Sequence, residues 1–144
     1  MHKGYYLAGP MAGRPQFNYP AFFKAAEILR GRGFTVISPA ELDDPATRAE
    51  ALANANGDLS QITSTWGDFL SRDVKIVADK VSGIILMPDW EKSRGARLEA
   101  TVGLLCKHDF LAWKDPELIE VPSEIIIHKL YKEFLYGGLK ANKP

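Results

Sequence analysis

Residues 81–107 read VSGIILMPDWEKSRGARLEATVGLLCK, and this stretch decides the fold. Its first part, Val81–Met87, is a short apolar run ended by Pro88, which is typical of a buried strand. After a loop, residues 94–107 place apolar side chains at helical spacing. A buried strand that leads through a short loop into an amphipathic helix is the repeating unit of a parallel α/β sheet.

The same alternation continues on both sides of this stretch. Further strands are predicted at Gly4–Ala8, Phe34–Ser38 and Asp109–Trp113. Further helices are predicted from near Asn18, a favoured N-cap residue, to Gly33, from Trp66 to Lys80 and from Ser123 to Leu135, with room for a short helix at 45–55. We expect a single-domain, Rossmann-like (flavodoxin-like) open parallel sheet of four to five strands flanked by helices. The domain is predicted to span residues 1–136 and to be followed by a flexible tail at 137–144.

The composition limits the classes of partner. The chain has 144 residues, of which 46% are hydrophobic and 25% charged, and its formal net charge is zero. These values are typical of a soluble globular domain and argue against a nucleic acid polymer or a membrane as the main partner. The single cysteine, Cys106, excludes an internal disulfide and is expected in the core. With no leader segment, the sequence predicts a cytoplasmic protein.

Ligands of open α/β sheets bind beyond the carboxyl ends of the strands, which here selects the loops at 9–18, 39–65 and 88–94. The first loop begins Gly9-Pro10-Met11-Ala12-Gly13-Arg14. Its glycines allow close approach of a ligand, and Arg14 offers a contact to phosphate. The alternative is a tight turn with a solvated arginine, because neither dinucleotide nor phosphate-loop fingerprints are present. The dispersed histidines and lone cysteine predict neither a metal site nor a cofactor.

Asp73 is a candidate catalytic acid. It lies within an apolar helical stripe formed by Trp66, Phe69, Leu70, Val74 and Val77. A carboxylate in such a stripe is unfavourable unless it is paired or used in chemistry. The alternatives are a buried cap, or an ion pair with Arg72 or with a distant cation.

Glu99 is the second candidate. It lies in the first half of the helix at 94–107, where the helix dipole favours an ionised carboxylate suited to act as a nucleophile. The alternative is an exposed glutamate that only compensates the dipole. Ser93 likewise has an ordinary interpretation as the N-cap of that helix.

Five stretches together resemble the nucleoside 2-deoxyribosyltransferase superfamily. They are Tyr6-Leu7-Ala8-Gly9-Pro10-Met11, Asn18-Tyr19-Pro20-Ala21-Phe22, Ser38-Pro39-Ala40-Glu41, Trp66-x-Asp68-Phe69-Leu70-x-Arg72-Asp73 and Trp90-x-x-Ser93-x-Gly95-Ala96-x-x-Glu99. The nearest likeness is to a branch of short phage and bacterial proteins related to the (deoxy)nucleoside 5′-monophosphate N-glycosidases. The resemblance spans about residues 4–112, with the motifs in the expected order.

The resemblance implies roles for individual residues. Glu99 matches the glutamate that attacks C1′ of the sugar, Asp73 the aspartate that assists departure of the base, and Tyr6 a tyrosine beside the nucleophile. The residues implied to bind substrate, mostly at its 5′ side, are Gly9, Met11, Gly13, Arg14, Trp90, Ser93 and Gly95, with Ser123 reaching a neighbouring subunit's phosphate. Ser82 replaces an aspartate often found just before the third strand.

The expected activity is hydrolysis of the base–sugar bond of a (deoxy)nucleoside 5′-monophosphate. Base exchange between deoxynucleosides, an NAD-type glycohydrolase and a non-catalytic nucleotide-binding or sensor module are the alternatives. The helix at 123–135 is apolar on more than one face, which predicts a homodimer or higher homo-oligomer. Ordinary core packing would explain that helix equally well.

Overall fold

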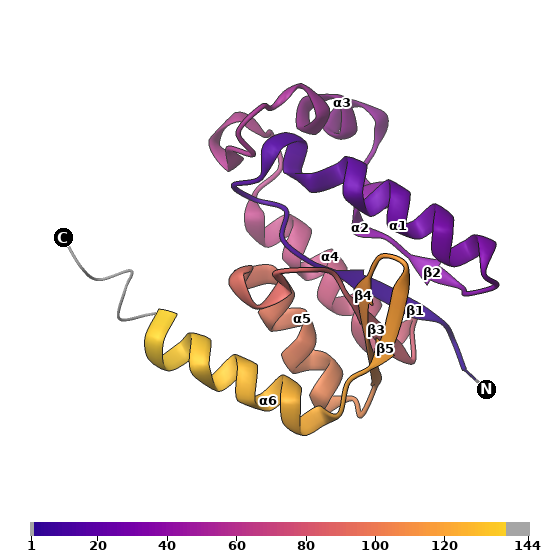
Figure 1. Cartoon of the computed structure of the whole chain (residues 1–144). Helices are drawn as coiled ribbons and strands as arrows, with labels where there is room; N and C mark the ends of the chain where they lie inside the picture. The colour runs from indigo at the N-terminus through magenta and orange to yellow at the C-terminus, as the bar shows by residue number, and fades with distance from the viewer. Residues whose placement is uncertain (1, 138–144) are drawn as a thin grey trace.

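The computed structural model describes residues 2–137, and its centre is a five-stranded sheet (Figure 1). The strands are β1 (Tyr5–Ala8), β2 (Val36–Ile37), β3 (Gly83–Leu86), β4 (Asp109–Lys114) and β5 (Glu117–Glu120), in the spatial order β2-β1-β3-β4-β5. The first four strands are parallel, and β5 is antiparallel to β4. This confirms the predicted open α/β sheet and adds an antiparallel edge strand. Of the tail predicted at 137–144, residues 138–144 lie outside the described part.

Helices occupy most of the connections. They are α1 (Tyr19–Gly31), α2 (Pro39–Leu42), α3 (Pro45–Ala53), α4 (Trp66–Asp79), α5 (Arg94–Leu105) and α6 (Ser123–Lys132), with short 3₁₀ turns η1 (Pro15–Asn18), η2 (Leu59–Gln61) and η3 (Trp90–Lys92), and a π-helical turn η4 (Glu133–Gly137). The predicted helices are present within a few residues of their expected bounds. The strand predicted at 34–38 is shorter, because β2 pairs with β1 alone and Pro39 starts a helix at once.

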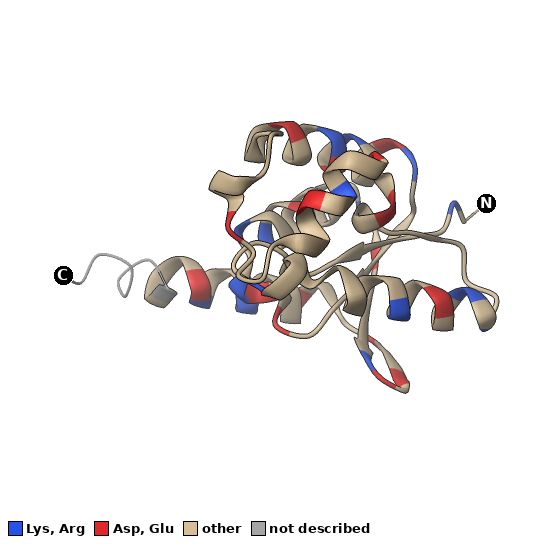
Figure 2. Cartoon of the chain, turned by 90° about the horizontal axis from the view of Figure 1, so that it is seen from above, with Lys and Arg blue, Asp and Glu red and all other residues tan. Residues whose placement is uncertain are grey.

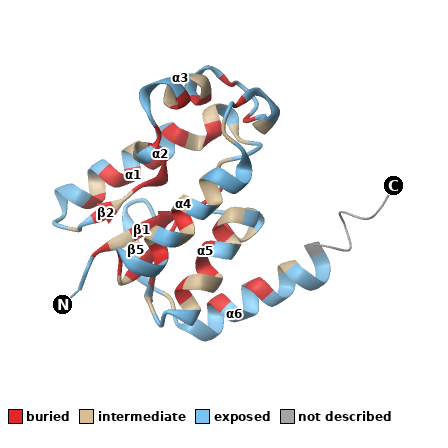
Figure 3. Cartoon of the chain, turned by 180° about the vertical axis from the view of Figure 1, so that it is seen from behind, coloured by how far each residue is buried: buried red, intermediate tan, exposed pale blue. Residues whose placement is uncertain are grey.

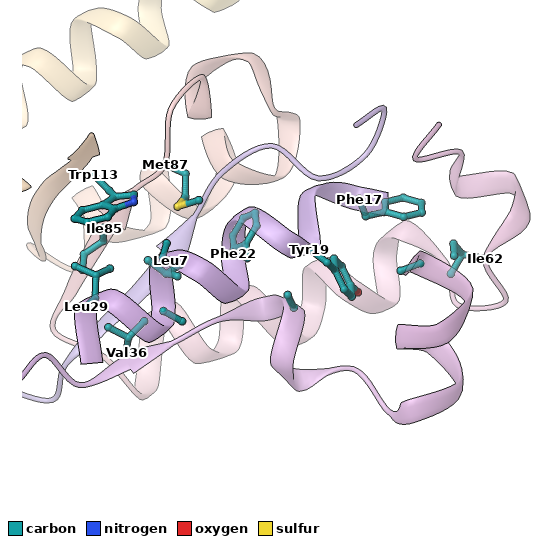
Figure 4. Close-up of a cluster of buried hydrophobic side chains, with 14 residues drawn as sticks. Leu7, Phe17, Tyr19, Phe22, Leu29, Val36, Ile62, Ile85, Met87 and Trp113 are labelled. Carbon is teal, nitrogen blue, oxygen red and sulfur yellow. The ribbon is translucent and has the colours of Figure 1, made fainter. Parts of the chain in front are cut away.

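Two apolar clusters cover the two faces of the sheet. Successive side chains of a strand point to opposite faces, so Leu7 of β1 joins the cluster under α1, while Tyr6 joins the cluster under α4, α5 and α6. Figure 4 shows the first cluster along α1, from Leu29 and Trp113 to Phe17 and Tyr19. Burial is accordingly concentrated in the strands and the inner sides of the helices (Figure 3).

The strand order reverses between β1 and β3, because β1 is followed by β2 on one side and by β3 on the other. Such a switch point leaves a crevice beyond the carboxyl ends of the strands. The chain segments that follow β1 and β3 lie close together there, because a Cβ atom on Gly9 would lie only 2.5 Å from Cβ of Met87. Glycine is therefore required at this position.

The first loop and the segment 43–64 hold each other in place. Gly13 N donates to Gly57 O at 2.8 Å, and Gln16 N donates to Asn54 O at 2.8 Å. Gly57 has a positive φ of 66°, and a Cβ there would lie 2.2 Å from Arg14 O. The segment predicted to be irregular thus forms an ordered wall above the sheet, and α3 occupies the position left open for a short helix.

Two local predictions need correction. Asn18 does not cap α1 with its side chain; it has a φ of 61°, and its Nδ2 donates to Pro10 O at 2.9 Å, which ties down the first loop. Cys106 is exposed instead of buried, because α5 ends at Leu105 and the chain turns there towards β4. Basic and acidic residues are mixed along the helices (Figure 2). Within residues 2–137, no helix combines the length and apolar character that crossing a membrane would require.

Candidate active site

A cavity of about 230 Å³ lies beyond the carboxyl ends of β1, β2 and β3. Its walls come from the first loop, α2 and α3, and the starts of α4 and α5. Its polar lining includes Tyr6, Tyr19, Asp43, Arg72, Asp73, Ser93 and Glu99, and its apolar lining includes Met11, Phe17, Leu59, Ile62, Trp66, Phe69 and Leu70. The location agrees with the general rule for open α/β sheets.

Tyr6 and Glu99 form the floor of the cavity. Glu99 lies on the buried side of α5 together with Ala96, Ala100 and Gly103, a spacing of three and four residues that presents one helix face to the sheet. The Tyr6 side chain is fully buried, and its hydroxyl donates a hydrogen bond to Oε2 of Glu99. Two groups 93 positions apart in the sequence are thereby brought into direct contact.

Burial controls the protonation of Glu99, which is only 5% exposed. Desolvation, and then the nearby charge of Asp73, raise the pKa of Glu99 well above its ordinary value, against the opposing effects of the Tyr6 hydrogen bond and Arg72. Burial therefore opposes the ionised carboxylate that the helix dipole was expected to favour. The dipole acts mainly within the first turn, and Glu99 is the sixth residue of α5.

Asp73 lies on α4 and is 8% exposed. Its Oδ1 accepts a hydrogen bond from Arg72 Nε at 2.9 Å. Desolvation raises the pKa of Asp73, and the hydrogen bond and charge of Arg72 oppose this rise. The ion pair with Arg72 that the sequence offered as an alternative is present, and Asp73 also lines the cavity that contains Glu99.

Arg72 connects Asp73 with a third buried acid, Asp43. Nη1 of Arg72 lies 2.5 Å from Oδ1 of Asp43, and the hydroxyl of Tyr19 donates to Oδ2 of the same carboxylate. Asp43 is 7% exposed, and desolvation raises its pKa while the Arg72 hydrogen bond lowers it. Sequence reasoning did not select Tyr19 or Asp43 as site residues. The available signal was their position, because both follow strands at the edge where a ligand binds.

The start of α5 forms another wall. Ser93 Oγ accepts a hydrogen bond from Ala96 N at 3.2 Å, which confirms the predicted N-cap. Ser93, Arg94 and Gly95 line the cavity, so the first amide groups of α5 are beside it. The Arg94 guanidinium lies 4.4 Å from the ring centroid of Trp66, which joins the starts of α5 and α4 across the rim.

Sequence comparison assigns the chain to a protein family. A family model described as a domain of unknown function (DUF4406) matches residues 3–110. The chain belongs to the DUF4406 family. Searches among curated proteins and among solved structures return no match. The matched range includes Tyr6, Asp73 and Glu99, whereas β5 and α6 follow it.

Seven of the residues selected from sequence meet at the cavity of this DUF4406 domain. They are Tyr6, Gly9, Met11, Asp73, Ser93, Gly95 and Glu99. The structure places four others outside the lining, namely Gly13, Arg14, Trp90 and Ser123. Gly13 bonds to the 43–64 segment, and Trp90 is buried in the core under α5. Arg14 pairs with Asp89 at 3.2 Å, and Ser123 starts α6.

Ser82 has a structural role at a distance from the cavity. It lies just before β3, whereas the cavity is beyond the opposite, carboxyl end of that strand. Ser82 Oγ accepts a hydrogen bond from Lys3 N at 2.8 Å. Ser82 therefore does not affect the arrangement of Asp43, Asp73 and Glu99 in the cavity of the DUF4406 domain. Within residues 2–137, His, Cys, Asp and Glu form no group of three or more suited to a metal ion.

Proposed function

We propose that this DUF4406 protein is an N-glycosidase that hydrolyses the base–sugar bond of a (deoxy)nucleoside 5′-monophosphate. The observation that carries the proposal is the meeting of Glu99, Tyr6 and Asp73 in one cavity. Cleavage of a glycosidic bond requires one carboxylate facing the anomeric carbon and a second group that protonates the leaving group. The resemblance of the sequence motifs to nucleoside deoxyribosyltransferases supports the same assignment.

The reaction uses the two acids in turn. A carboxylate oxygen of Glu99 forms a bond to C1′ while the C1′–N bond breaks. The electron pair of the C1′–N bond goes to the base, and the base takes the proton of Asp73. Water then attacks C1′, loses a proton to Asp73, and releases Glu99 as a carboxylate. The base and the sugar phosphate leave, and both acids have returned to their starting state.

The electrostatics of the site support a pair that holds a single proton. Burial and the charge of Asp73 raise the pKa of Glu99, so the two carboxyls resist being ionised together. The reactive form has Glu99 ionised, with Tyr6 donating to it, and Asp73 protonated. Activity should then follow a bell-shaped pH profile that belongs to the pair.

The start of α5 supports a phosphate at the 5′ end of the substrate. Helix N-termini attract anions through their free amide groups and the helix dipole. Ser93 and Gly95 line this end of the cavity, and Arg94 adds a positive charge. Arg14, which was expected to contact the phosphate, instead pairs with Asp89. We therefore assign phosphate binding to the start of α5.

The test is base release from a panel of deoxy- and ribonucleoside 5′-monophosphates, followed by chromatography. We expect the wild type to release base, Glu99→Ala to be inactive, and Glu27→Gln, an exposed glutamate on α1, to match the wild type. Equal release from nucleosides without phosphate would refute the phosphate preference. Formation of a new nucleoside on addition of a free base would indicate base exchange instead of hydrolysis.

One observation favours a second candidate, a non-catalytic nucleotide-binding or sensor module. Burial raises the pKa of Glu99 well above its ordinary value, and a protonated carboxyl is a poor nucleophile. In this case nucleotides would bind without turnover, and Glu99→Ala would bind as tightly as the wild type. Calorimetric titration of both proteins with the same panel separates the two candidates.

We further propose that the chain self-associates through α6 and η4. Of the apolar residues in this segment, Ile126 and Leu130 pack on the core, whereas Ile127, Tyr131 and Phe134 are 55%, 60% and 68% exposed. Much of α6 is accordingly exposed (Figure 3). The helix has Glu124 in its first turn and Lys129 and Lys132 in its last, so two antiparallel copies would bring opposite charges together.

Light scattering after size exclusion tests the association. We expect the wild type to be at least dimeric and Tyr131→Glu to be monomeric. A monomeric wild type at micromolar concentration would contradict it.

A further inference from the structure

Arg72 lies between two carboxylates that come from different parts of the chain. Its Nε donates to Asp73, the next residue on α4, at 2.9 Å. Its Nη1 donates to Asp43, which directly follows α2, at 2.5 Å. A third, longer contact joins Nη2 to Pro39 O at 3.5 Å. One positive charge is thus divided between two acids, of which only Asp73 has a role in the proposed reaction.

Asp43 is fixed by its surroundings. The Tyr19 hydroxyl from the first turn of α1 donates to its Oδ2, while Arg72 occupies its Oδ1. With both oxygens bonded and 7% of the residue exposed, Asp43 has little freedom to move. The guanidinium is planar and its donors have a fixed geometry, so Asp43 also fixes the orientation that Arg72 presents to Asp73.

The charges around Asp73 show what this arrangement changes. The groups that face Asp73 are Arg72 on α4, Tyr6 on β1, Asp43 after α2 and Glu99 on α5. Desolvation raises the pKa of Asp73, Arg72 and Tyr6 lower it, and the charge of Asp43 raises it again. A cation that served Asp73 alone would hold that carboxyl ionised more firmly than a shared one does.

We propose that Asp43 is a positioning residue that draws Arg72 away from exclusive pairing with Asp73, so that Asp73 keeps the proton it delivers to the leaving base. Asp43 acts through Arg72 and through its own charge, and touches no reacting atom. The catalytic part of this inference rests on the proposed N-glycosidase function. The control of Asp73 by Asp43 does not, because it concerns only the contacts within this chain.

The experiment measures the titration of Asp73 directly. Carboxyl ¹³C resonances are followed by NMR from acid to neutral pH in the wild type and in Asp43→Asn, with Asp73→Asn used to assign the Asp73 signal. We expect the Asp73 midpoint to move to lower pH in Asp43→Asn. The matched control is Asp44→Asn, which removes the neighbouring charge but no contact with Arg72, keeps a residue that can cap α3, and should leave the midpoint in place.

The same variants are assayed for base release. In Asp43→Asn the limb of the pH profile in which Asp73 titrates should move to lower pH, with kcat at neutral pH lower by about 10- to 100-fold. KM should change by less than about threefold, since the substrate contacts remain. A purely structural role for Asp43 would reduce the amount of folded protein without moving the limb.

Each outcome has one meaning. An unchanged Asp73 midpoint in Asp43→Asn overturns the proposal, whatever the protein catalyses. A shifted midpoint in a protein that releases no base from any nucleotide supports the control of Asp73 and refutes the N-glycosidase. If Asp43→Asn does not fold, Tyr19→Phe replaces it, because loss of the tyrosine hydrogen bond weakens the hold of Asp43 on Arg72. It should then shift the midpoint in the same direction but less, and no shift overturns the proposal.

Discussion

Leu7 and Tyr6 are neighbours on β1, yet they belong to two faces of the sheet that are built differently. Leu7 points under α1 and meets Phe22, Leu29 and Ile85, all fully buried and apolar. Tyr6 points under α4 and α5, where the buried residues include Asp73 and Glu99. Buried acids reduce stability unless they are paired or neutralised. The first face therefore supplies stability that offsets the cost of the buried acids on the second.

Truncation on the α1 face should give the largest loss of stability. Phe22→Ala removes a fully buried ring, and we expect the free energy of unfolding to fall by about 3–5 kcal/mol. Urea denaturation followed by circular dichroism measures this change. In the fraction that stays folded, nucleotide affinity should be that of the wild type. A loss below about 1 kcal/mol would contradict the proposed difference between the two faces in their contribution to stability.

The sequence was sufficient for most of this architecture. The apolar runs of β1 and β3 and the stripe of α4 are local patterns, and they predicted these elements closely. The missed strand β5 (Glu117–Glu120) is short, follows Pro116 and has two exposed glutamates, so it carries little apolar signal. Its pairing with β4 is a tertiary effect that single-sequence patterns do not contain.

The candidate site was predicted less completely. Asp73 was found because it interrupts an apolar stripe, and Glu99 through the order of the motifs. Asp43 was missed because its importance depends on Arg72, 29 positions away, and no periodicity reports such a pair. The same limit applies to Arg14, for which a phosphate contact was expected. Its side chain pairs with Asp89 from another loop, and sequence patterns do not report such a contact.

Removal of the Tyr6 hydroxyl tests the face of the sheet under α4 and α5. We expect Tyr6→Phe to lower kcat by about 100-fold, the usual order for the loss of one positioned hydrogen-bond donor. The lost hydrogen bond had opposed the rise in the pKa of Glu99, so this pKa should rise further and the limb of the pH profile in which Glu99 titrates should move to higher pH. Base release measured across pH tests both effects. A profile in which neither limb moves would contradict the role of Glu99 in the pH dependence.

Replacement of Glu99 should stabilise the protein. Burial raises the pKa of Glu99, so the neutral carboxyl favours folding below the ordinary value of 4.5, and this contribution is lost as pH rises through the folded-state pKa. Glutamine cannot ionise, so Glu99→Gln avoids the burial of a charge at neutral pH. It should raise the free energy of unfolding near neutral pH by about 1–2 kcal/mol, the usual size for a stabilising substitution. The gain should disappear in acid. Thermal unfolding at several pH values measures it, with Glu27→Gln expected to show no gain.

The smallest effect is expected outside the cavity. Arg14 is partly exposed and pairs with Asp89, and such surface pairs contribute about 0–1 kcal/mol. Arg14→Ala should therefore change KM for a nucleotide by less than about twofold, whereas Ser93→Ala should raise it clearly. Steady-state kinetics of the two variants decide between them. A larger effect of Arg14→Ala would return the phosphate site to the first loop.

The most direct measurement is the rate of base release by wild type and Glu99→Ala from the nucleotide that the panel identifies. We predict release by the wild type and by Glu27→Gln at equal rates, and a rate at least about 1,000-fold lower in a folded Glu99→Ala protein. Equal rates in wild type and Glu99→Ala, or no release by either from any nucleotide, would contradict the assignment of Glu99 as the nucleophile of an N-glycosidase.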